Sequence, residues 1–183
     1  PSGKSWTYLF VDMPATREAL RAYLDAQAKT ADPLCHTLID KSTGRAVGIA
    51  SFMRIDANMG AIEVGNINYS ERLKRTAVAT EVMFLMMKRV FDELGYRRYE
   101  WKCDSLNHPS RKAAERYGFV YEGTFRQAVT YKGRNRDTAW FSMIDKEWPA
   151  LKRAYEAWLD PANFDAQGAQ RRGLADMIKE AQR

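Results

Sequence analysis

The sequence predicts an α/β fold with a mixed, mostly antiparallel sheet, one parallel β-α-β crossover and flanking helices. A long helical pattern over 76–94 separates two strand patterns at 61–69 and 97–103, and two strands joined by a helix lie parallel. The strand patterns before residue 70 are instead joined by short turns, which is typical of an antiparallel meander. A further pair at 119–131 and 138–144, with a short polar turn between them, predicts a β-hairpin.

The first third of the chain contains one helix and the start of the meander. The apolar run 6–11 is compatible with a strand or with a lead-in segment. From Pro14 the apolar residues recur at helical spacing, and proline suits the first turn of a helix. Strands are expected at 36–40 and 47–55, and Gly44 allows the turn between them because glycine adopts positive φ.

The rest of the chain predicts three further helices. The helix over 76–94 has one apolar face, formed by Val78, Val82, Leu85, Met86, Val90 and Leu94. A shorter helix runs to Tyr117, and either Asn107 or Ser110 can cap its N-terminus. A helix at 146–159 follows, and the polar, basic segment 162–183 is expected to be a tail or a loosely docked helix.

Length and composition indicate one folded domain at 1–160, followed by the basic C-terminal segment 161–183. The chain has 183 residues, of which 45% are hydrophobic, so it can form a sizeable core. It lacks a run of ~18 apolar residues, and its first residues lack the apolar core of a signal peptide. Cys35 and Cys103 are too few for a disulfide scaffold and predict reduced thiols in a cytoplasmic protein.

The net charge of +6 and the pI near 9.4 suggest an anionic partner. A basic surface attracts nucleic acid, an anionic membrane or a ligand that carries phosphate. It can also serve solubility alone. Composition does not distinguish among these four interpretations.

Three motifs between about 41 and 148 carry a resemblance to a known family. They are Ala79-Thr80-Glu81 at the start of the long helix, Asn107-x-x-Ser110-x4-Glu115-x-x-Gly118-Phe119, and Gly123 before the terminal hairpin. In this order they resemble the GNAT N-acetyltransferases, and within them the RimJ/RimL-type branch, which acetylates ribosomal-protein N-termini and related amines. The resemblance implies direct transfer of acetyl from acetyl-CoA to a primary amine, either a protein N-terminus or a small amine, without a metal.

Two features depart from the family pattern. The acetyl-CoA loop has glycine at the position that Arg75 occupies here, whereas Ala77 conforms to the pattern. The family's opening strand and first helix are not evident before Trp6. Either the chain starts inside the domain, or this region has diverged.

The segment before the long helix is expected to bind acetyl-CoA. Unpaired N–H groups and the positive dipole end of a helix N-terminus bind a diphosphate without any particular side chain. We expect Arg72, Lys74 and Arg75 to pair with phosphates of CoA, the alternative being a solvated charged loop. The resemblance implies that Asn107 holds the pantetheine arm. The residues expected to bind acetyl-CoA are Ile67, Asn68, Arg72, Lys74, Arg75, Thr76, Ala77, Val78, Ala79 and Asn107.

Acetyl transfer requires a base for the amine, a donor for the oxyanion and a proton for the thiolate. Glu63 is the expected base, acting directly or through water, and Ile62 and Val64 should face the other side of the sheet. A structural ion pair with an arginine is the alternative. Ser110 is the expected acid, because Ala114 stands where many relatives have tyrosine; capping its helix is the alternative. A backbone N–H within 66–68 is expected to bind the oxyanion.

The remaining candidates are weaker. Neither cysteine is paired with a catalytic histidine, and His36 and His108 lack zinc spacing. The resemblance implies that the hairpin borders the acceptor site or a homodimer contact. A basic rim there would attract an acidic peptide or a ribosomal surface, the alternative being a solvated hairpin; its basic residues are Arg126, Lys132, Arg134 and Arg136. A non-catalytic acyl-CoA-binding regulatory module and a nucleic-acid-binding domain remain alternatives, and the phosphate-compatible loop makes nucleic acid the weaker one. A membrane partner is not expected.

Overall fold

The computed structural model describes residues 3–183 and contains a six-stranded sheet in the order β1-β2-β3-β4-β6-β5. The strands are β1 (Leu34–Asp40), β2 (Arg45–Asp56), β3 (Ala61–Tyr69), β4 (Arg98–Asp104), β5 (Val120–Tyr131) and β6 (Arg134–Ile144). Neighbouring strands are antiparallel except β3 and β4, which are parallel. The predicted fold class is therefore confirmed, including its single parallel crossover.

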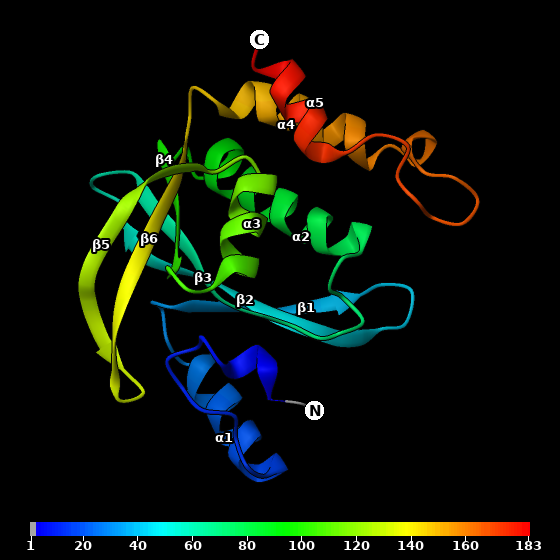
Figure 1. Ribbon diagram of the computed structural model, residues 1–183. Helices are drawn as coiled ribbons and strands as arrows, with labels where there is room; N and C mark the ends of the chain where they lie inside the picture. Colours follow the sequence, from blue (N-terminus) through cyan, green and yellow to red (C-terminus); the bar gives the residue numbers. More distant parts are fainter. Residues whose placement is uncertain (1–2) are drawn as a thin grey trace.

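Helices cover the two faces of the sheet unequally. Figure 1 shows α2, α3, α4 and α5 on one face, and α1 with the N-terminal segment on the other. The elements are η1 (Lys4–Trp6), α1 (Arg17–Gln27), α2 (Ala77–Lys88), the π-helical turn η2 (Arg89–Glu93), α3 (His108–Arg116), α4 (Trp148–Leu159), η3 (Pro161–Asn163) and α5 (Leu174–Ala181). None of the helices formed by residues 3–183 has the length and apolarity needed to cross a membrane.

The ends of several elements differ from those predicted, for local reasons. The run 6–11 forms no strand: after η1 it continues as turns and bends. The first helix begins at Arg17 rather than Pro14, because the hydroxyl of Thr16 accepts a hydrogen bond from the amide of Ala19 and caps the helix there. The helix expected over 76–94 changes at Arg89 into η2, where Leu94 donates to the carbonyl of Arg89.

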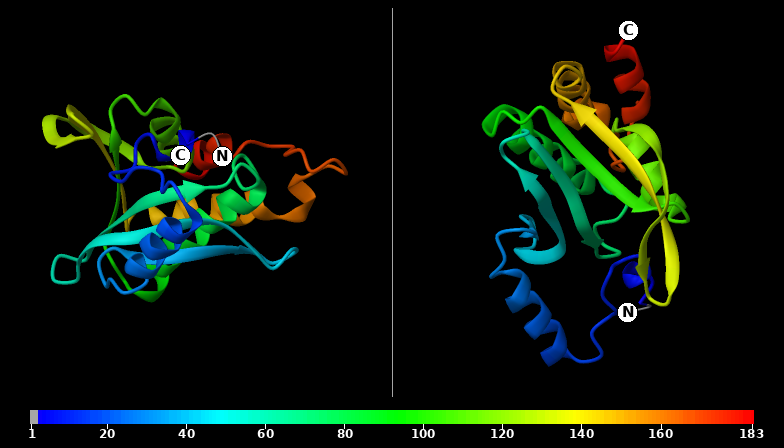
Figure 2. Two further views of the ribbon diagram at one scale, coloured as in Figure 1. Left: turned by 90° about the horizontal axis from the view of Figure 1, so that it is seen from below. Right: turned by 90° about the vertical axis from the view of Figure 1, so that its left-hand side faces the viewer.

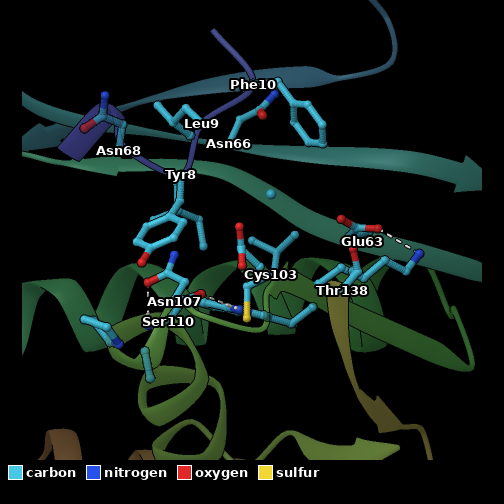
Figure 3. Close-up of a pocket in the computed structure, with 18 of the residues that line it drawn as sticks. Tyr8, Leu9, Phe10, Glu63, Asn66, Asn68, Cys103, Asn107, Ser110 and Thr138 are labelled. Carbon is cyan, nitrogen blue, oxygen red and sulfur yellow. Dashed lines mark hydrogen bonds and ion pairs between the residues drawn. The ribbon is translucent and has the colours of Figure 1, made fainter. Parts of the chain in front are cut away.

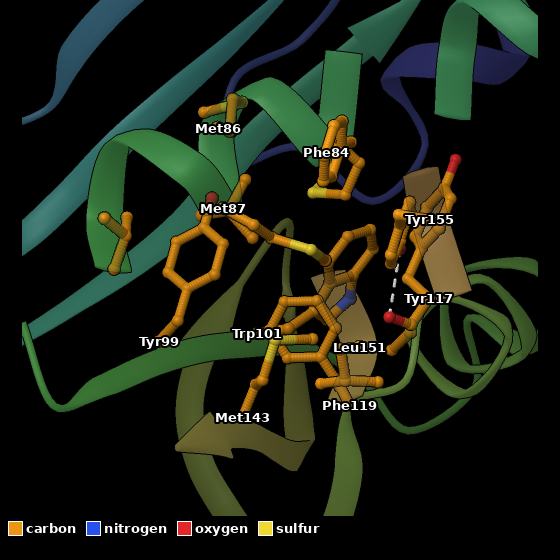
Figure 4. Packing of buried hydrophobic residues seen from close by; sticks show 14 of the residues in the cluster. Phe84, Met86, Met87, Tyr99, Trp101, Tyr117, Phe119, Met143, Leu151 and Tyr155 are labelled. Atoms are coloured by element: carbon orange, nitrogen blue, oxygen red, sulfur yellow. Dashed lines mark hydrogen bonds between the residues drawn. The ribbon is translucent and has the colours of Figure 1, made fainter. Parts of the chain in front are cut away.

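The main core lies between the sheet and the helices α2 and α4. Its aromatic rings contact one another directly: Phe84 stacks on Tyr155 with centroids 5.4 Å apart, and Phe91 stacks on Trp148 at 5.3 Å. Figure 4 shows Met87 of α2 reaching in among the buried aromatic side chains. Unbranched methionine side chains suit irregular gaps in a core. The Met-rich run of α2 therefore serves packing, with Met83 and Met87 fully buried.

The segment after residue 160 is packed onto the domain. Helix α5 lies beside α4 (Figure 1), and its apolar side chains Leu174, Met177 and Ile178 are buried in the main core cluster. Asn163 fixes the connection, because its amide donates to the carbonyls of Trp158 and Arg172. Of the two forms expected for this segment, the structure shows the docked helix.

Gly118 is where α3 turns into β5 against both C-terminal helices. Its φ is +90°, and an added Cβ would lie 2.7 Å from Leu151 Cδ2 and 3.3 Å from Ile178 Cδ1. We expect Gly118→Ala to lower the free energy of unfolding by about 2 kcal/mol or more, through backbone strain and overpacking. Urea denaturation measures this loss. Gly133→Ala is the control for backbone strain alone, because Gly133 has φ +73° and open space around it. If both variants lose the same free energy of unfolding, overpacking at Gly118 does not contribute.

Candidate active site

The site begins where the two parallel strands separate. β3 and β4 pair only from Ala61–Val64 against Arg98–Trp101. Beyond these pairs, β3 contains an extra residue relative to β2, and Asn66 adopts a left-handed conformation with φ 50°. The backbone N–H and C=O groups of β3 that would face β4 after Val64 therefore have no partner strand. They line a gap in the sheet.

A cavity of about 820 Å³ lies at this gap and is lined by residues from both faces of the sheet. On the helical face it is lined by residues of α2 and α3 and of the loops before them. On the other face it is lined by Glu63, by β4 and β6, and by the N-terminal segment. Figure 3 shows Tyr8 projecting across the cavity toward Asn107, and Glu63 lying apart on the other side of Cys103. The volume is typical of a small-molecule site.

The N-terminus of α2 presents open amides at the helical end of the cavity. The Thr76 hydroxyl caps the helix by accepting from the Ala79 amide at 3.2 Å, and it donates to the Leu73 carbonyl at 2.7 Å. In the part of the chain that the structure describes, no carbonyl or side chain accepts from the amides of Arg75, Ala77 and Val78. Three open amides and the helix dipole form a site for an anion.

The backbone of Arg75 has the conformation that the expected glycine would adopt. Its φ is 62°, in the left-handed region that glycine enters without cost. The backbone thus keeps the loop shape, while the exposed guanidinium is available beside the open amides. Lys74 is held by Glu71 at 2.6 Å. Arg72 is exposed and does not line the cavity.

Removal of the Arg75 charge should weaken binding of acetyl-CoA. We expect Arg75→Ala to raise the Kd about 3- to 10-fold, the range of one charge-assisted contact at a partly exposed site. The difference should shrink as salt increases, because salt screens exposed charges. Isothermal titration at two salt concentrations measures both effects. Arg45→Ala is the control, because Arg45 is exposed at the start of β2 and lies outside the cavity. An unchanged Kd in Arg75→Ala would remove Arg75 from the phosphate site.

Asn107 and Ser110 lie next to each other at the start of α3, in different roles. Asn107 is the N-cap: its Oδ1 accepts from the Ser110 amide at 3.2 Å. Its amide Nδ2 donates to no described residue, so capping leaves a donor for a ligand. Ser110 does not cap the helix. Its hydroxyl accepts from Trp101 Nε1 at 3.0 Å and lies beside Cys103.

Glu63 is buried on the face of the sheet opposite the core. Ile62 and Val64 lie in the core cluster, as their alternation with Glu63 predicts. Glu63 Oε2 is 2.8 Å from Arg54 Nη1 and 2.8 Å from Lys102 Nζ, and the carboxylate is only 4% exposed. The arginine ion pair that was the alternative to a base is therefore present. Both cations contact Oε2, which leaves Oε1 on the side of Gly65 at the bulge.

The structure brings most of the sequence-predicted site residues together. Those that line the cavity are Glu63, Ile67, Asn68, Lys74, Arg75, Ala79, Asn107 and Ser110. Arg72, Thr76, Ala77 and Val78 do not line it. Thr76 contributes as the helix cap, and Ala77 and Val78 contribute their backbone amides at the entrance.

Cys103 lies at the centre of the cavity wall, yet its surroundings do not favour a nucleophile. It is buried, and burial raises the pKa of its thiol above the ordinary value. Nucleophilic cysteines need the opposite shift, toward the thiolate. Both cysteines are free in the structure; Cys103 is buried, whereas Cys35 is only partly buried.

Sequence reasoning missed the N-terminal wall and the Lys102 cluster. Tyr8 donates to the carbonyl of Leu106 at 3.0 Å, which attaches the segment after η1 to the loop before α3. Lys102 joins Glu63 and Glu100, and its Nζ lies 3.9 Å above the Trp140 ring. Period-2 alternation places Glu100 and Lys102 on one face of β4. Their meeting with Glu63 requires the strand register, which the sequence does not state.

The basic hairpin residues do not form one rim. Arg126 is exposed, whereas Lys132 donates to the carbonyl of Trp6 at 2.9 Å and Arg134 forms an ion pair with Asp104. Figure 2 shows the hairpin tip beside the N-terminal segment that Lys132 contacts. Arg136 is 6% exposed and lines the cavity. These four residues therefore do not form the single basic rim that would attract an acidic partner, because the hairpin directs them to different surroundings.

Comparison with known proteins assigns this arrangement to a family. The model of the acetyltransferase (GNAT) domain matches residues 3–120, which is more than half of the chain. The chain belongs to the GNAT acetyltransferase family. A crystal structure of a GCN5-related N-acetyltransferase from Brucella melitensis is 51% identical, with a TM-score of 0.95, and the match covers 97% of this chain and 80% of that chain.

Curated relatives are more distant. An uncharacterized N-acetyltransferase, p20, from Bacillus licheniformis is 29% identical over 112 residues, which is 61% of this chain and 62% of that protein. The putative ribosomal N-acetyltransferase YdaF from Bacillus subtilis (strain 168) is 25% identical over 109 residues, which is 60% of this chain and 59% of that protein. The chain thus spans about three fifths of the length of these relatives.

Proposed function

We propose that this protein transfers an acetyl group from acetyl-CoA to a primary amine by direct attack. The cavity at the gap between β3 and β4 is the observation that carries this proposal. It joins an anion site at the N-terminus of α2 to a carboxylate on the opposite face of the sheet. Two substrates entering from opposite faces would meet inside the gap.

The helical end suits the co-substrate. The open amides of Arg75, Ala77 and Val78, together with the Arg75 guanidinium, fit the diphosphate. The backbone groups on the β4 side of β3 beyond Val64 and the free amide of Asn107 fit the polar groups of a pantetheine arm. Acetyl-CoA supplies a thioester, which is an activated acetyl group. A backbone N–H at the bulge, within 66–68, would bind the oxyanion that forms at the acetyl carbonyl.

The other end would receive the amine. Glu63 takes a proton from the ammonium, directly or through one water, and the neutral nitrogen attacks the acetyl carbonyl carbon. The nitrogen of the tetrahedral intermediate loses its second proton to solvent as the C–S bond breaks. The released thiolate takes a proton from Ser110, and Ser110 regains one from solvent. Arg54 and Lys102 orient the Glu63 carboxylate so that Oε1 faces the gap.

The acceptor is a protein N-terminus or a small amine. Similarity to a putative ribosomal N-acetyltransferase favours the RimJ/RimL-type branch and a protein N-terminus. The free thiols Cys35 and Cys103 suit a reducing, cytoplasmic setting. A homodimer through the hairpin stays a prediction, as does the absence of a metal.

A non-catalytic acyl-CoA-binding regulatory module is the second candidate. It is favoured by the double ion pair of Glu63, which gives this carboxylate a structural role without any reaction. Nucleic-acid binding loses support, because the basic hairpin residues contact different partners instead of forming one exposed patch.

A thiol-release assay tests the function. Acetyl-CoA is incubated with the protein and with a panel of peptide N-termini and small amines, and free CoA is quantified. We expect release that depends on both protein and amine, together with thermal stabilisation by acetyl-CoA alone. Stabilisation without release on any acceptor would favour the regulatory module. Salt-dependent RNA binding without any effect of acetyl-CoA would overturn both.

A further inference from the structure

The cavity contains one buried cation that no carboxylate neutralises. Arg136 on β6 is 6% exposed, and its Nε has no hydrogen-bond partner. Within residues 3–183 its guanidinium forms no ion pair. It contacts two aromatic rings instead, with Cζ 5.0 Å from the centroid of Phe10 and 5.7 Å from that of Tyr131. A buried charge without a partner is costly, and such a group commonly awaits a ligand.

The other charged side chains on this face of the cavity form ion pairs with one another. Lys102 and Arg54 are paired with Glu63, and Glu100 adds a second carboxylate on Lys102 at 2.6 Å. Asp104, which also lines the cavity, has partners of its own. It accepts from Tyr131 at 2.7 Å and forms an ion pair with Arg134. Arg136 therefore leaves one positive charge in excess at the end of the cavity where the amine would enter.

The wall around this charge is apolar and aromatic. Residues 136, 138 and 140 alternate along β6 on one face, and all three line the cavity. Trp140 stacks on Phe125 with centroids 4.6 Å apart, and Phe125 is 56% exposed at the mouth. Phe10 covers the guanidinium from the N-terminal segment. This surface suits a ligand that carries an apolar group next to an anionic group.

We propose that Arg136 binds a carboxylate of the acceptor, so that the preferred substrate is an amine carrying both a carboxylate and an apolar group. This acceptor class depends on the acetyl transfer proposed above. A guanidinium presents two parallel N–H donors that match a carboxylate. One excess charge is neutralised by one carboxylate. Polyamines, which bring only further positive charge, are disfavoured at this end.

Matched pairs of probes measure this preference. For a free amino acid the pair is L-phenylalanine and L-phenylalaninamide. For a peptide it is Ala-Asp-Ala-amide and Ala-Asn-Ala-amide, which places the carboxylate in a side chain. We expect kcat/KM to favour the acid by at least tenfold in one of the two pairs, and the pair that responds identifies the source of the carboxylate. A site built around a charged hydrogen bond discriminates strongly against the neutral analogue.

Substitution of Arg136 should remove the preference. In Arg136→Gln, kcat/KM for the acid and for the amide of the responding pair should differ by less than about threefold. Arg136→Lys should retain part of the preference, because it keeps the positive charge but loses the two parallel N–H donors. The control is Arg126→Gln, which removes the same charge from an exposed position of the same hairpin. It should leave the preference unchanged.

A binding measurement separates this inference from the proposed function. Thermal stabilisation by 3-phenylpropionate and by 3-phenylpropanamide needs no turnover. The acid should stabilise the wild-type protein more than the amide, and Arg136→Gln should abolish the difference. Equal effects of acid and amide in every pair, or a preference that persists in Arg136→Gln, would overturn the role of Arg136. If no acceptor is acetylated but the wild-type protein still binds the acid better than the amide, and this preference is lost in Arg136→Gln, the proposed acetyl transfer is wrong. The anion site at Arg136 is then supported on its own.

Discussion

Glu63→Gln should lower kcat/KM for acetyl transfer about a hundredfold or more, the usual effect of losing a positioned general base. The amide is nearly isosteric with the carboxylate, so it keeps contacts to Arg54 and Lys102 while losing the ability to take a proton. The loss should become smaller at high pH, because more of the acceptor amine is then already neutral. Steady-state rates at several pH values measure this, with the amine at fixed concentration.

Glu100→Gln is the matched control for Glu63. Glu100 also contacts Lys102, at 2.6 Å, but it does not line the cavity. If Glu63 only neutralises Lys102, both variants should behave alike, in stability and in rate, at every pH. A rate loss confined to Glu63→Gln, and reduced at high pH, is what a base predicts. Equal, pH-independent losses would contradict the role proposed for Glu63.

Asp104→Ala should lower the free energy of unfolding by about 3 kcal/mol, because several bonds to one buried carboxylate are lost together. Asp104 is 1% exposed at the end of β4. It accepts from the Leu106 amide at 2.9 Å and from the Tyr131 hydroxyl at 2.7 Å, and it pairs with Arg134. Removal of the carboxylate leaves the Tyr131 hydroxyl buried without an acceptor. Urea denaturation at pH 7 measures the loss.

The Asp104 effect should depend on pH in a defined direction. Burial alone would raise the pKa of this carboxyl, but the bonds from Leu106, Tyr131 and Arg134 outweigh it and hold the pKa below the ordinary value. A lowered pKa stabilises the fold above the unfolded-state value of about 3.9 and ceases to do so as pH falls through the folded-state value. The difference between wild type and Asp104→Ala should therefore narrow below about pH 4.

Asp12→Ala serves as the control for Asp104. Asp12 also contacts a hairpin cation, Lys132 at 3.2 Å, but its side chain is 90% exposed. Exposed pairs contribute little, so this variant should change the free energy of unfolding by less than about 1 kcal/mol. Similar losses in the two variants would mean that burial of Asp104 does not determine its contribution.

The sequence predicts the order of elements well, because that order depends on local periodicity and turns. The strand Ala61–Tyr69 has the predicted bounds, and Glu63 lies on the predicted face. The end of α2 and its continuation as η2 were not predictable, since the same apolar face runs through both. Docking of α5 depends on α4, Gly118 and the core at once, which no single segment reveals.

The two ends of the site differ in how far the sequence predicts them. The helical end of the cavity is built from the loop before α2 and from the N-termini of α2 and α3, and motif spacing alone predicts that Arg75 and Asn107 lie there. The acceptor end is built from β3, β4, β6 and the N-terminal segment. Burial of Arg136 and its isolation from carboxylates result from hairpin twist and from Phe10, which lies 126 positions earlier in the chain. Such long-range relations require the fold.

The short pairing between β3 and β4 also has a mechanical consequence. Only four residue pairs join the two strands, so we expect the backbone ladder to hold β1–β3 to β4–β6 less firmly here than at the other strand pairs. A ligand lying along this junction replaces the missing ladder and ties the two parts together. Its binding is therefore reported by slower amide exchange on both sides of the junction, including strands that it does not touch.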